Sequence, residues 1–374
     1  MTTLLVTNDF PPTVGGIQSY LRDFVDTLDP EGIIVFASTQ DAQAAQAWDS
    51  VAKYRVIRWR RSVMLPTPAT VREMQRIIRE FNIDTVWFGA AAPLAVMGHA
   101  AKSAGASRVI ATTHGHEVGW SMLPGARQVL GIIGDSADVV TYISAYTLRR
   151  FRRAFGDQPE FVHLPSGVDT EYFTPASANR RLATREKFGF ANGPIVVCAS
   201  RLVPRKGQDQ LIRAFKGVVD KHSDARLVII GQGRYRSVLE TLAKDLGEHV
   251  VFTGALPRDE MRDLVAAADV VAMPARTRGG GLDVEGLGIV YLEAQSCGVP
   301  VIAGASGGAP ETVTQETGLV VDGTDLPALE NALLTLLEDP SLRRSMGRAG
   351  RAHVLHNWTW PIMAQRLAQL LNQA

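Results

Sequence analysis

Two hydrophobic patterns alternate along the 374-residue chain. Short continuous apolar runs, typical of strands buried on both faces, are followed by segments with apolar residues three or four positions apart, typical of helices packed on one face. In the first such segment Ile17, Tyr20 and Phe24 share one helical face. The alternation predicts an α/β fold built from parallel, doubly wound sheets.

The same pattern locates the individual elements. In the N-terminal half we expect strands at 4–6, 32–36, 54–59, 85–88, 108–112 and 139–143, and helices near 17–28, 71–81, 94–103, 127–133 and 148–155. In the C-terminal half we expect strands at 195–199, 226–231, 250–253, 270–273, 299–303 and 319–321, and helices at 209–219, 235–245, 259–267 and 289–297. From residue 327 onward the pattern is helical, with an interruption at 358–361.

Turn-forming residues concentrate between 164 and 179, where the first alternation ends and a second one begins. The chain is also too long for one ordinary hydrophobic core. We therefore expect an N-terminal domain over 1–169 and a C-terminal domain over 170–358. The last helix, 359–374, is expected to cross back to the first domain.

The composition of the chain limits which partners it is expected to bind and in which cellular compartment it is expected to lie. The net charge is +1, which gives no overall field toward nucleic acid, so no nucleic-acid partner is expected. The two cysteines, Cys198 and Cys297, lie in apolar runs and fit a reducing cytoplasm better than a disulfide framework. The first residues lack the basic and long apolar regions of a signal peptide, and no apolar run is long enough to span a membrane. These features predict a cytoplasmic protein.

Two carboxylates flank the start of the helix that ends at Gly298. Glu285 lies in the loop before this helix and Glu293 lies eight residues later, inside it. Residues eight apart are about 80° from eclipsed and roughly two turns separated, so the two side chains do not stack as a pair. One helix then contacts two ends of a long polar ligand, although a solvated glutamate beside a helix cap gives the same pattern.

Cationic residues follow the first strand of the second domain. Arg201 and Lys206 flank a turn at its carboxyl end, where a planar fork and a point charge together suit a diphosphate. In the first domain, Gly15 and Gly16 open a helix directly after a strand, either to present backbone N–H groups to phosphate or to form a tight turn with positive φ.

Three motifs for other modes of phosphate binding are absent from the sequence. There is no P-loop, no complete G-x-G-x-x-G fingerprint and no Asp-x-Asp that would hold a diphosphate through a metal. We therefore expect cationic side chains to replace a metal, with no metal or other cofactor. His114 and His116 follow the strand 108–112, and without further ligands at suitable spacing they are expected to form a polar site wall or an ordinary loop rather than a metal centre.

These motifs together resemble one enzyme family. Two doubly wound domains with Gly15-Gly16, Arg201 and Lys206, and Glu-x7-Glu before Ala-Gln-Ser-Cys-Gly-Val-Pro look like a retaining GT-B glycosyltransferase of family 4. Within it the chain most resembles the actinobacterial PimB-type enzymes of phosphatidylinositol mannoside synthesis. The resemblance implies transfer of mannose from GDP-mannose to a phosphatidylinositol mannoside, in a cleft between two Rossmann-like domains.

The resemblance also implies roles for individual residues at the nucleotide. Arg201 and Lys206 would bind the donor diphosphate, and the backbone N–H of Gly16 would approach its distal phosphate. Glu293 would accept hydrogen bonds from the ribose hydroxyls. No metal is implied.

For the donor hexose, the resemblance assigns Glu285 and a neighbouring set of backbone N–H groups to the sugar hydroxyls. This set comprises Gly286, Leu287, Gly288 and Ile289. His114 would contact the sugar from the first domain, although the sequence leaves open whether His114 or His116 does so. Neither Glu285 nor Glu293 is an obvious nucleophile, so we expect front-face attack in which the leaving phosphate oxygen takes the acceptor's proton.

Two stretches of the first domain predict contact with an anionic membrane surface. Residues 55–66 combine arginines with Trp59, Met64 and Leu65, and 148–155 combine four arginines with Phe151 and Phe155. Solvated helix faces would give the same composition. With a lipid acceptor, the expected location is peripheral, on the inner face of the plasma membrane. A further loop, 276–282, carries two arginines that we expect to serve the acceptor or a closing motion.

Three other functions compete. A family 4 enzyme could use a UDP-sugar and a soluble acceptor such as an inositol phosphate or a glucan. The sequence does not show which nucleotide base the donor pocket accepts. A nicotinamide-dependent oxidoreductase conflicts with the incomplete glycine fingerprint. A sugar-nucleotide epimerase on the same two-domain fold would consume donor without an acceptor.

Overall fold

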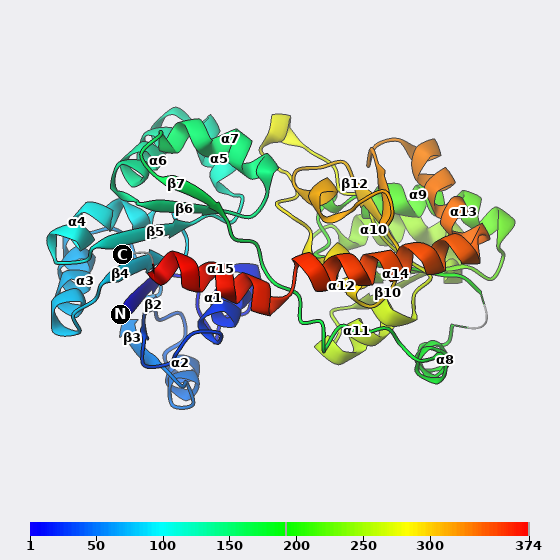
Figure 1. Cartoon of the computed structure of the whole chain (residues 1–374). Coiled ribbons are helices and arrows are strands. Elements are labelled where there is room, and N and C mark those ends of the chain that lie inside the picture. Colours follow the sequence, from blue (N-terminus) through cyan, green and yellow to red (C-terminus); the bar gives the residue numbers. More distant parts are fainter. Residues whose placement is uncertain (191–192, 373–374) are drawn as a thin grey trace. The chain divides into compact units, whose positions relative to one another are not determined.

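The computed structural model describes residues 1–190 and 193–372 (Figure 1). It divides into two compact units, one formed by Met1–Ser166 with Pro361–Ala374 and the other by Gly167–Trp360. Each unit contains one parallel sheet covered by helices, as the alternating pattern predicted. In the described ranges, no helix combines the length and apolar character needed to cross a bilayer.

The first unit is built on a seven-stranded parallel sheet in the order β3-β2-β1-β4-β5-β6-β7. The order reverses direction beside β1, and ligands of such sheets bind at this switch point, beyond the carboxyl ends of the strands. The strands are β1 (Thr3–Thr7), β2 (Ile33–Ser38), β3 (Arg55–Trp59), β4 (Thr85–Phe88), β5 (Arg108–Thr112), β6 (Val139–Tyr142) and β7 (Glu160–His163).

Helices cover this sheet on both faces, and one of them comes from the C-terminus of the chain. They are α1 (Gly16–Val25), α2 (Ala42–Asp49), α3 (Pro68–Glu80), α4 (Gly98–Ser103), α5 (Glu117–Met122), α6 (Pro124–Ser136), α7 (Ala145–Phe155) and α15 (Trp360–Asn372). The membership of α15 in this unit confirms the predicted return of the C-terminal helix. It buries Met363, Leu367, Leu370 and Leu371.

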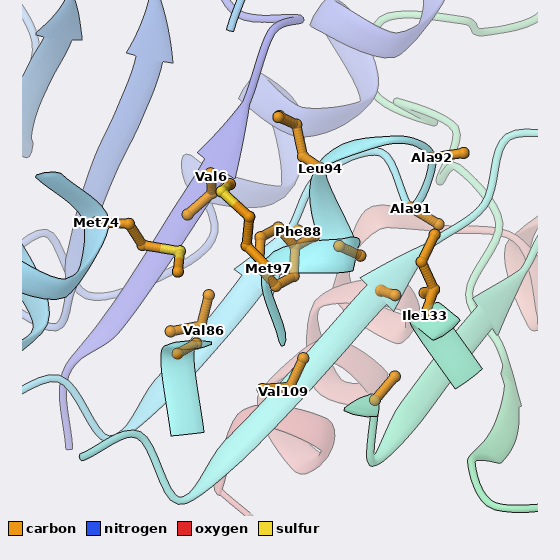
Figure 2. Close-up of a cluster of buried hydrophobic side chains, with 14 of the residues drawn as sticks. Val6, Met74, Val86, Phe88, Ala91, Ala92, Leu94, Met97, Val109 and Ile133 are labelled. Atoms are coloured by element: carbon orange, nitrogen blue, oxygen red, sulfur yellow. The ribbon is translucent and has the colours of Figure 1, made fainter. Parts of the chain in front are cut away.

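Side chains from neighbouring strands and covering helices interlock in the core of the first unit. Val6, Val86 and Val109 come from β1, β4 and β5, and Met74, Met97 and Ile133 from the helical segments pack against them (Figure 2). All six residues of β2 are buried, which is why its sequence is continuously apolar rather than alternating.

The second unit repeats the architecture with six parallel strands in the order β10-β9-β8-β11-β12-β13. The strands are β8 (Ile195–Ala199), β9 (Arg226–Ile230), β10 (Val250–Gly254), β11 (Val270–Met273), β12 (Val301–Gly304) and β13 (Gly318–Val321). Its helices are α8 (Ala178–Lys187), α9 (Gln208–Lys221), α10 (Arg236–Ala243), α11 (Arg258–Ala267), α12 (Ile289–Ser296), α13 (Leu326–Glu338) and α14 (Pro340–Asn357). Here the strand order reverses beside β8.

Elements with weak apolar periodicity escaped the sequence prediction. Helix α2 buries only Ala45, and α8 buries only Thr184, so neither presents a continuous apolar face. Strand β7 lies at the sheet edge with an exposed first residue and partly buried remainder. Both helices begin at a side-chain cap instead, Asp41 for α2 and Ser177 for α8.

The two stretches predicted to form mixed basic and aromatic surfaces are partly buried, which corrects that prediction. On α7, Phe151 and Phe155 belong to the core, while the four arginines around them are exposed. In the other stretch Trp59 and Met64 are buried as well. The aromatic side chains of both stretches are therefore packing residues, and the exposed apolar groups beside the arginines are aliphatic or methionine side chains instead.

Candidate active site

Two loops at the carboxyl edge of the second unit bring Lys206 and Glu285 together. Lys206 ends a short 3₁₀ turn after β8, and Glu285 lies in the long loop after β11. The Nζ atom of Lys206 lies 2.6 Å from Oε2 of Glu285. The side chain of Lys206 is only 12% exposed and that of Glu285 only 8%. The contact is an ion pair without directional hydrogen-bond geometry. The expected diphosphate cation and the expected hexose carboxylate are thus each other's partners in this structure.

The backbone around Glu285 is fixed by the loop that follows β12. The N–H of Glu285 donates to Ser306 Oγ at 3.3 Å, and its carbonyl oxygen accepts from Gly308 N–H at 2.9 Å. Gly307 lies between these contacts with φ 59°, and a Cβ there would lie 1.8 Å from the Glu285 carbonyl oxygen. Only glycine permits this approach, so the carboxylate sits on a rigid backbone.

Arg205 is a member of this cluster that sequence reasoning missed. Its Nη1 lies 3.4 Å from Asp283 Oδ1, and its Nε lies 3.8 Å from Glu285 Oε2. The buried Nε makes no hydrogen bond to any described residue. Two cations therefore alternate with two carboxylates. The adjacent basic residue in the Arg-Lys doublet was the available signal, but only the fold shows that both side chains reach the loop after β11.

Arg201, unlike Lys206, has no ion-pair or hydrogen-bond partner for its guanidinium among the described residues. It follows the carboxyl end of β8 and is exposed, and no ion pair or side-chain hydrogen bond within 1–190 and 193–372 involves its guanidinium. Gln208 Nε2 instead donates to its carbonyl oxygen at 2.9 Å, which fixes the backbone of the turn. Arg201 is thus available to an anionic ligand, whereas Lys206 must first part from Glu285.

Helix α12 begins beside this cluster without a side-chain cap. Gly288 precedes it with φ 87°. The predicted group of Gly286, Leu287, Gly288 and Ile289 therefore forms the approach to a positive helix end. Glu293 lies half-buried inside the helix, where burial raises its pKa to about 7 against a smaller opposing effect of Arg258.

The loop before Glu285 is anchored, which corrects part of its predicted role. Arg276 Nη2 forms a 2.8 Å ion pair with Asp209 Oδ2, and both side chains are almost fully buried. The Arg276 N–H also donates to the Arg205 carbonyl oxygen at 2.8 Å. Arg276 therefore holds the loop against α9 and is not free for an acceptor. Arg278 is exposed.

In the first unit, His114 lies in the loop after β5. Its Nε2 lies 2.7 Å from the carbonyl oxygen of Gly89, which follows β4. A carbonyl only accepts hydrogen bonds, so Nε2 carries the proton and Nδ1 keeps a lone pair. Burial lowers the pKa of His114, with Glu117 opposing the shift, and the imidazole is neutral at pH 7. The ring also packs edge-on against Tyr20, with centroids 4.9 Å apart.

Glu117 fixes this histidine loop and was missed by sequence reasoning. Its fully buried carboxylate accepts from the backbone N–H groups of His114 and Gly115 at 3.1 and 3.0 Å. Oε1 of Glu117 also lies 3.2 Å from Nε2 of His116, whose side chain is 42% exposed. His114 is therefore locked against the sheet edge, and His116 is the outer residue. The sequence feature that could have identified Glu117 was its position as an acid in the first turn of α5, but the apolar pattern did not predict this helix.

Gly16 occupies the first position of α1, at the carboxyl end of β1. Gly15 is extended, with φ 178°, and Gly16 begins the helix, so neither adopts the left-handed conformation that the tight-turn explanation requires. An added Cβ on Gly16 would meet nothing within 4 Å. The open space lies beside unengaged N–H groups of a helix start, which suits close approach of an anion.

Family models match both units. The model for "Glycosyltransferase Family 4" matches residues 14–172, and the model for "Glycosyl transferases group 1" matches residues 181–353. A GDP-mannose-dependent monoacylated alpha-(1-6)-phosphatidylinositol monomannoside mannosyltransferase of Corynebacterium glutamicum is 64% identical over 99% of this chain and 97% of its own length. The chain belongs to the family 4 glycosyltransferases.

Further relatives and solved structures agree with this membership. GDP-mannose-dependent alpha-(1-6)-phosphatidylinositol monomannoside mannosyltransferases of Mycolicibacterium smegmatis and Mycobacterium tuberculosis are 54% and 52% identical, covering 99% and 98% of this chain and 98% and 97% of their own. HepE of Anabaena, crystallised with UDP, has a TM-score of 0.84 at 21% identity, with both chains fully covered. A sucrose-phosphate synthase from Thermosynechococcus elongatus scores 0.82 at 23% identity, covering 100% and 99% of the two chains. The predicted GT-B fold is confirmed.

Membership in family 4 sets aside the oxidoreductase and epimerase alternatives, because the family transfers glycosyl groups. Within the described ranges, no group of three His, Cys, Asp or Glu side chains gathers as metal ligands do. Arg201, Arg205 and Lys206 all lie at the carboxyl edge of the second unit's sheet, in the segment that follows β8.

Proposed function

We propose that this glycosyltransferase moves mannose from GDP-mannose to a phosphatidylinositol monomannoside, with the α-(1-6) linkage that its relatives' names carry. The observation that carries the proposal is 64% identity, over 99% of the chain, to a mannosyltransferase of that description. Relatives named D-inositol 3-phosphate glycosyltransferases are only 31–33% identical over about 60% of the chain. That contrast favours the lipid acceptor over a soluble inositol phosphate.

The charged cluster of the second unit supports a donor-binding role. Arg201 and Lys206 bind the diphosphate, Arg201 directly and Lys206 by exchanging Glu285 for phosphate oxygens. Glu285 is then free to accept hydrogen bonds from hydroxyls of the mannose, together with N–H groups at the start of α12. Arg205, whose Nε lies 3.8 Å from Glu285 Oε2, remains a cationic neighbour of this carboxylate after Lys206 has changed partner.

The remaining donor contacts rest on groups with matching hydrogen-bond chemistry. The lone pair on Nδ1 of His114 accepts from a mannose hydroxyl, since Nε2–H is already used on Gly89. The N–H of Gly16 approaches the distal phosphate. Glu293 accepts from the ribose hydroxyls once it is ionised. His114, rather than His116, is the sugar contact in this proposal, because Glu117 fixes its loop and Gly89 fixes its tautomer.

The reaction breaks the bond between the mannose anomeric carbon and the diphosphate and forms a bond to the acceptor oxygen on the same face. Fixed cations stabilise the diphosphate that departs with the bonding electrons. The acceptor's proton passes to a departing phosphate oxygen, so no side chain has to act as nucleophile. We propose that no metal takes part, and transfer should persist in the presence of a chelator.

The surface of the first unit supports a peripheral membrane location. Helices α5, α6 and α7 pack together (Figure 1), and Arg149, Arg150 and Arg153 are exposed on α7. Met122 and Leu123, at the turn between α5 and α6, are 40% and 56% exposed, and Arg150 Nη2 lies 3.2 Å from Met122 Sδ. Cations beside exposed apolar side chains suit the interface of an anionic leaflet.

A second patch follows β3, at the other end of the same sheet edge. Arg60 and Arg61 are exposed there, and the nearby Val63 and Leu65 are 55% and 52% exposed. The patches flank the carboxyl edge on which His114 and Gly16 lie. We propose that both patches contact the inner leaflet of the plasma membrane, from which the lipid acceptor is taken.

Product analysis tests the proposed reaction. Radiolabelled GDP-mannose is incubated with phosphatidylinositol monomannoside, phosphatidylinositol or inositol phosphate, and the organic and aqueous phases are counted after extraction. Label is expected in one lipid product, only with the monomannoside. Label in a water-soluble product, or equal transfer from UDP-glucose, would overturn the proposal.

A further inference from the structure

A pocket of about 310 Å³ lies at the amino-terminal edge of the sheet in the second unit. Asp269 and Pro300, which immediately precede β11 and β12, form part of its wall. Arg181 of α8 and Arg343 and Arg344 of α14 complete the charged part of its lining. Nothing in the proposed transfer reaction uses this pocket.

The charges around the pocket are unbalanced. Arg181 and Arg185 each place Nη2 2.6 Å from an oxygen of Asp269, and Arg343 Nε lies 3.9 Å from the same carboxylate. Three guanidinium groups thus surround the Asp269 carboxylate, exposed Arg344 also lines the pocket, and the next acid, Asp339, caps the start of α14. Asp269 also accepts from the N–H of Ile195 at 2.8 Å, so its oxygens are fully engaged. Partly buried cations in such excess favour an additional anion.

Several donors of these arginines remain unused. Nη1 of Arg343 donates to the carbonyl oxygens of Leu336 and Leu337, both at 2.6 Å. These hydrogen bonds cap the C-terminal end of α13. The Nη2 of Arg343, the Nη1 of Arg181 and the whole exposed guanidinium of Arg344 bond to no described residue. Burial and the neighbouring arginines lower the pKa of Arg181, although its guanidinium stays charged.

The backbone adds a smaller positive contribution. Pro340, the first residue of the 18-residue helix α14, lines the pocket at the positive end of the helix dipole, and this end is partly neutralised by Asp339, whose carboxylate accepts from the N–H groups of Ser341 and Leu342. Cys297 also lines the pocket, but burial raises the pKa of its thiol to about 12. The thiol is therefore protonated at pH 7, and the pocket is suited to binding rather than to thiol chemistry.

The pocket is separate from the donor residues of the same unit. Strands β11 and β12 each have four residues, which span about 13 Å, and the pocket lies before them. Glu285 and Ser306 lie after them. Helix α12 makes the same connection, since Gly288 precedes it at the donor edge and Gly298 follows it at the pocket. An anion in the pocket cannot be the donor diphosphate bound at the carboxyl edge.

We propose that this arginine pocket binds a small phosphate-bearing anion, with Arg181, Arg343 and Arg344 as its ligands. Guanidinium forks match the oxygens of a phosphate group, and three converging arginines suit a dianion better than a monovalent carboxylate. A pocket of this volume accommodates a free phosphate or a small phosphate ester. The ligand is expected from solution rather than from a membrane, because exposed apolar residues do not line the pocket.

Inorganic phosphate tests the site directly on the full chain. The melting temperature is followed as phosphate is titrated at constant ionic strength, with sodium chloride as the balancing salt. The wild-type protein should show a saturable increase. Arg344→Gln should weaken the apparent phosphate affinity by about tenfold, because one charge-assisted partner is lost. Arg348→Gln removes the same charge one turn further along α14 and should leave the affinity unchanged.

A second variant blocks the pocket without removing an arginine. Ala176 lines the pocket and is half-buried, so Ala176→Glu supplies a permanent carboxylate to the free guanidinium groups. This variant should fold with an unchanged or raised melting temperature and lose the phosphate response. Phosphate bound at Arg201 and Lys206 would be indifferent to it. Wild-type protein without a saturable response, or full responses in both Ala176→Glu and Arg344→Gln, would overturn the proposal.

Vesicles distinguish a soluble ligand from a lipid headgroup. Sedimentation with phosphatidylinositol vesicles is expected to be the same for Ala176→Glu and the wild type. Loss of vesicle binding in Ala176→Glu, without any effect of inorganic phosphate on the wild type, would contradict a site for soluble phosphates. Both results are independent of whether mannose transfer is observed.

Discussion

The two units present opposite chemistry at equivalent edges of similar sheets. In the second unit the side chains are charged and already neutralise each other, with Lys206 2.6 Å from Glu285 and Arg205 3.4 Å from Asp283. In the first unit His114 is neutral, its tautomer is set by Gly89, and the start of α1 beside Gly16 is open. A ligand must therefore exchange partners in the second unit, but only add contacts in the first.

This difference indicates how each site is prepared. Internal ion pairing gives a buried lysine and a buried glutamate a partner when no ligand is bound, because an unpaired buried charge is costly. A neutral histidine needs no counterion, only an orientation, which Gly89 and Glu117 provide. Loss of a cation in the second unit should therefore lower donor affinity and turnover together, whereas substitutions in the first unit should act mainly on turnover.

Replacing Lys206 should have the largest effect. Lys206→Ala removes a diphosphate ligand and the partner of Glu285, so mannose transfer should fall by about a thousandfold or more. GDP affinity should fall by about a hundredfold. Calorimetric titration of GDP and a steady-state transfer assay measure the two losses. The matched control is Lys216→Ala on the exposed face of α9. Full GDP affinity in Lys206→Ala would contradict the diphosphate assignment.

Substitutions of His114 and His116, in the loop after β5, test the expectation that the first unit acts mainly on turnover. His114→Ala should lower kcat by about a hundredfold while GDP affinity changes little, since a lost sugar contact acts on the reacting group. His116→Ala removes an exposed ring and should lower kcat only a few fold through its contact with Glu117. A larger loss in His116→Ala than in His114→Ala would assign the sugar contact to His116 instead.

The sequence predicted the two parallel sheets and all their strands except the edge strand β7, because buried parallel strands have a strong apolar signature. It also singled out Lys206 and Glu285, but it could not show that they form an ion pair, because their contact depends on the tertiary course of two loops. Arg205 and Glu117 were missed for related reasons. Arg205 resembled an ordinary basic turn residue, and Glu117 begins a helix too short to leave a periodic signal.

A pH profile tests the half-buried carboxylate of α12. The pKa of Glu293 is raised from 4.5 to about 7, so the donor KM should fall by about tenfold from pH 6 to pH 8 as the carboxylate ionises. Its raised pKa also means that its favourable contribution to folding is complete below pH 4.5 and is lost as pH rises through 7. Glu293→Gln should flatten the KM profile and gain stability relative to wild type above pH 7. An unchanged KM profile in Glu293→Gln would contradict the ribose assignment.

The membrane surface should show the smallest loss among these variants. Leu123→Asp places a charge at the apolar tip between α5 and α6 and should reduce sedimentation with anionic vesicles by about fivefold. Leu355→Asp, on exposed α14, introduces the same charge and should bind vesicles like the wild type. Equal sedimentation of wild-type protein with anionic and neutral vesicles would remove the electrostatic part of the proposal.

The partner exchange between Lys206 and Glu285 is tested most directly by the affinity of Glu285→Gln for GDP. Removing the carboxylate frees Lys206 for the diphosphate, so calorimetric titration should give a Kd equal to that of the wild type or up to about tenfold tighter. Mannose transfer by the same variant should fall by at least about a hundredfold, because the sugar hydroxyls lose their acceptor. A GDP affinity as weak as that of Lys206→Ala, or transfer at the wild-type rate, would contradict the account.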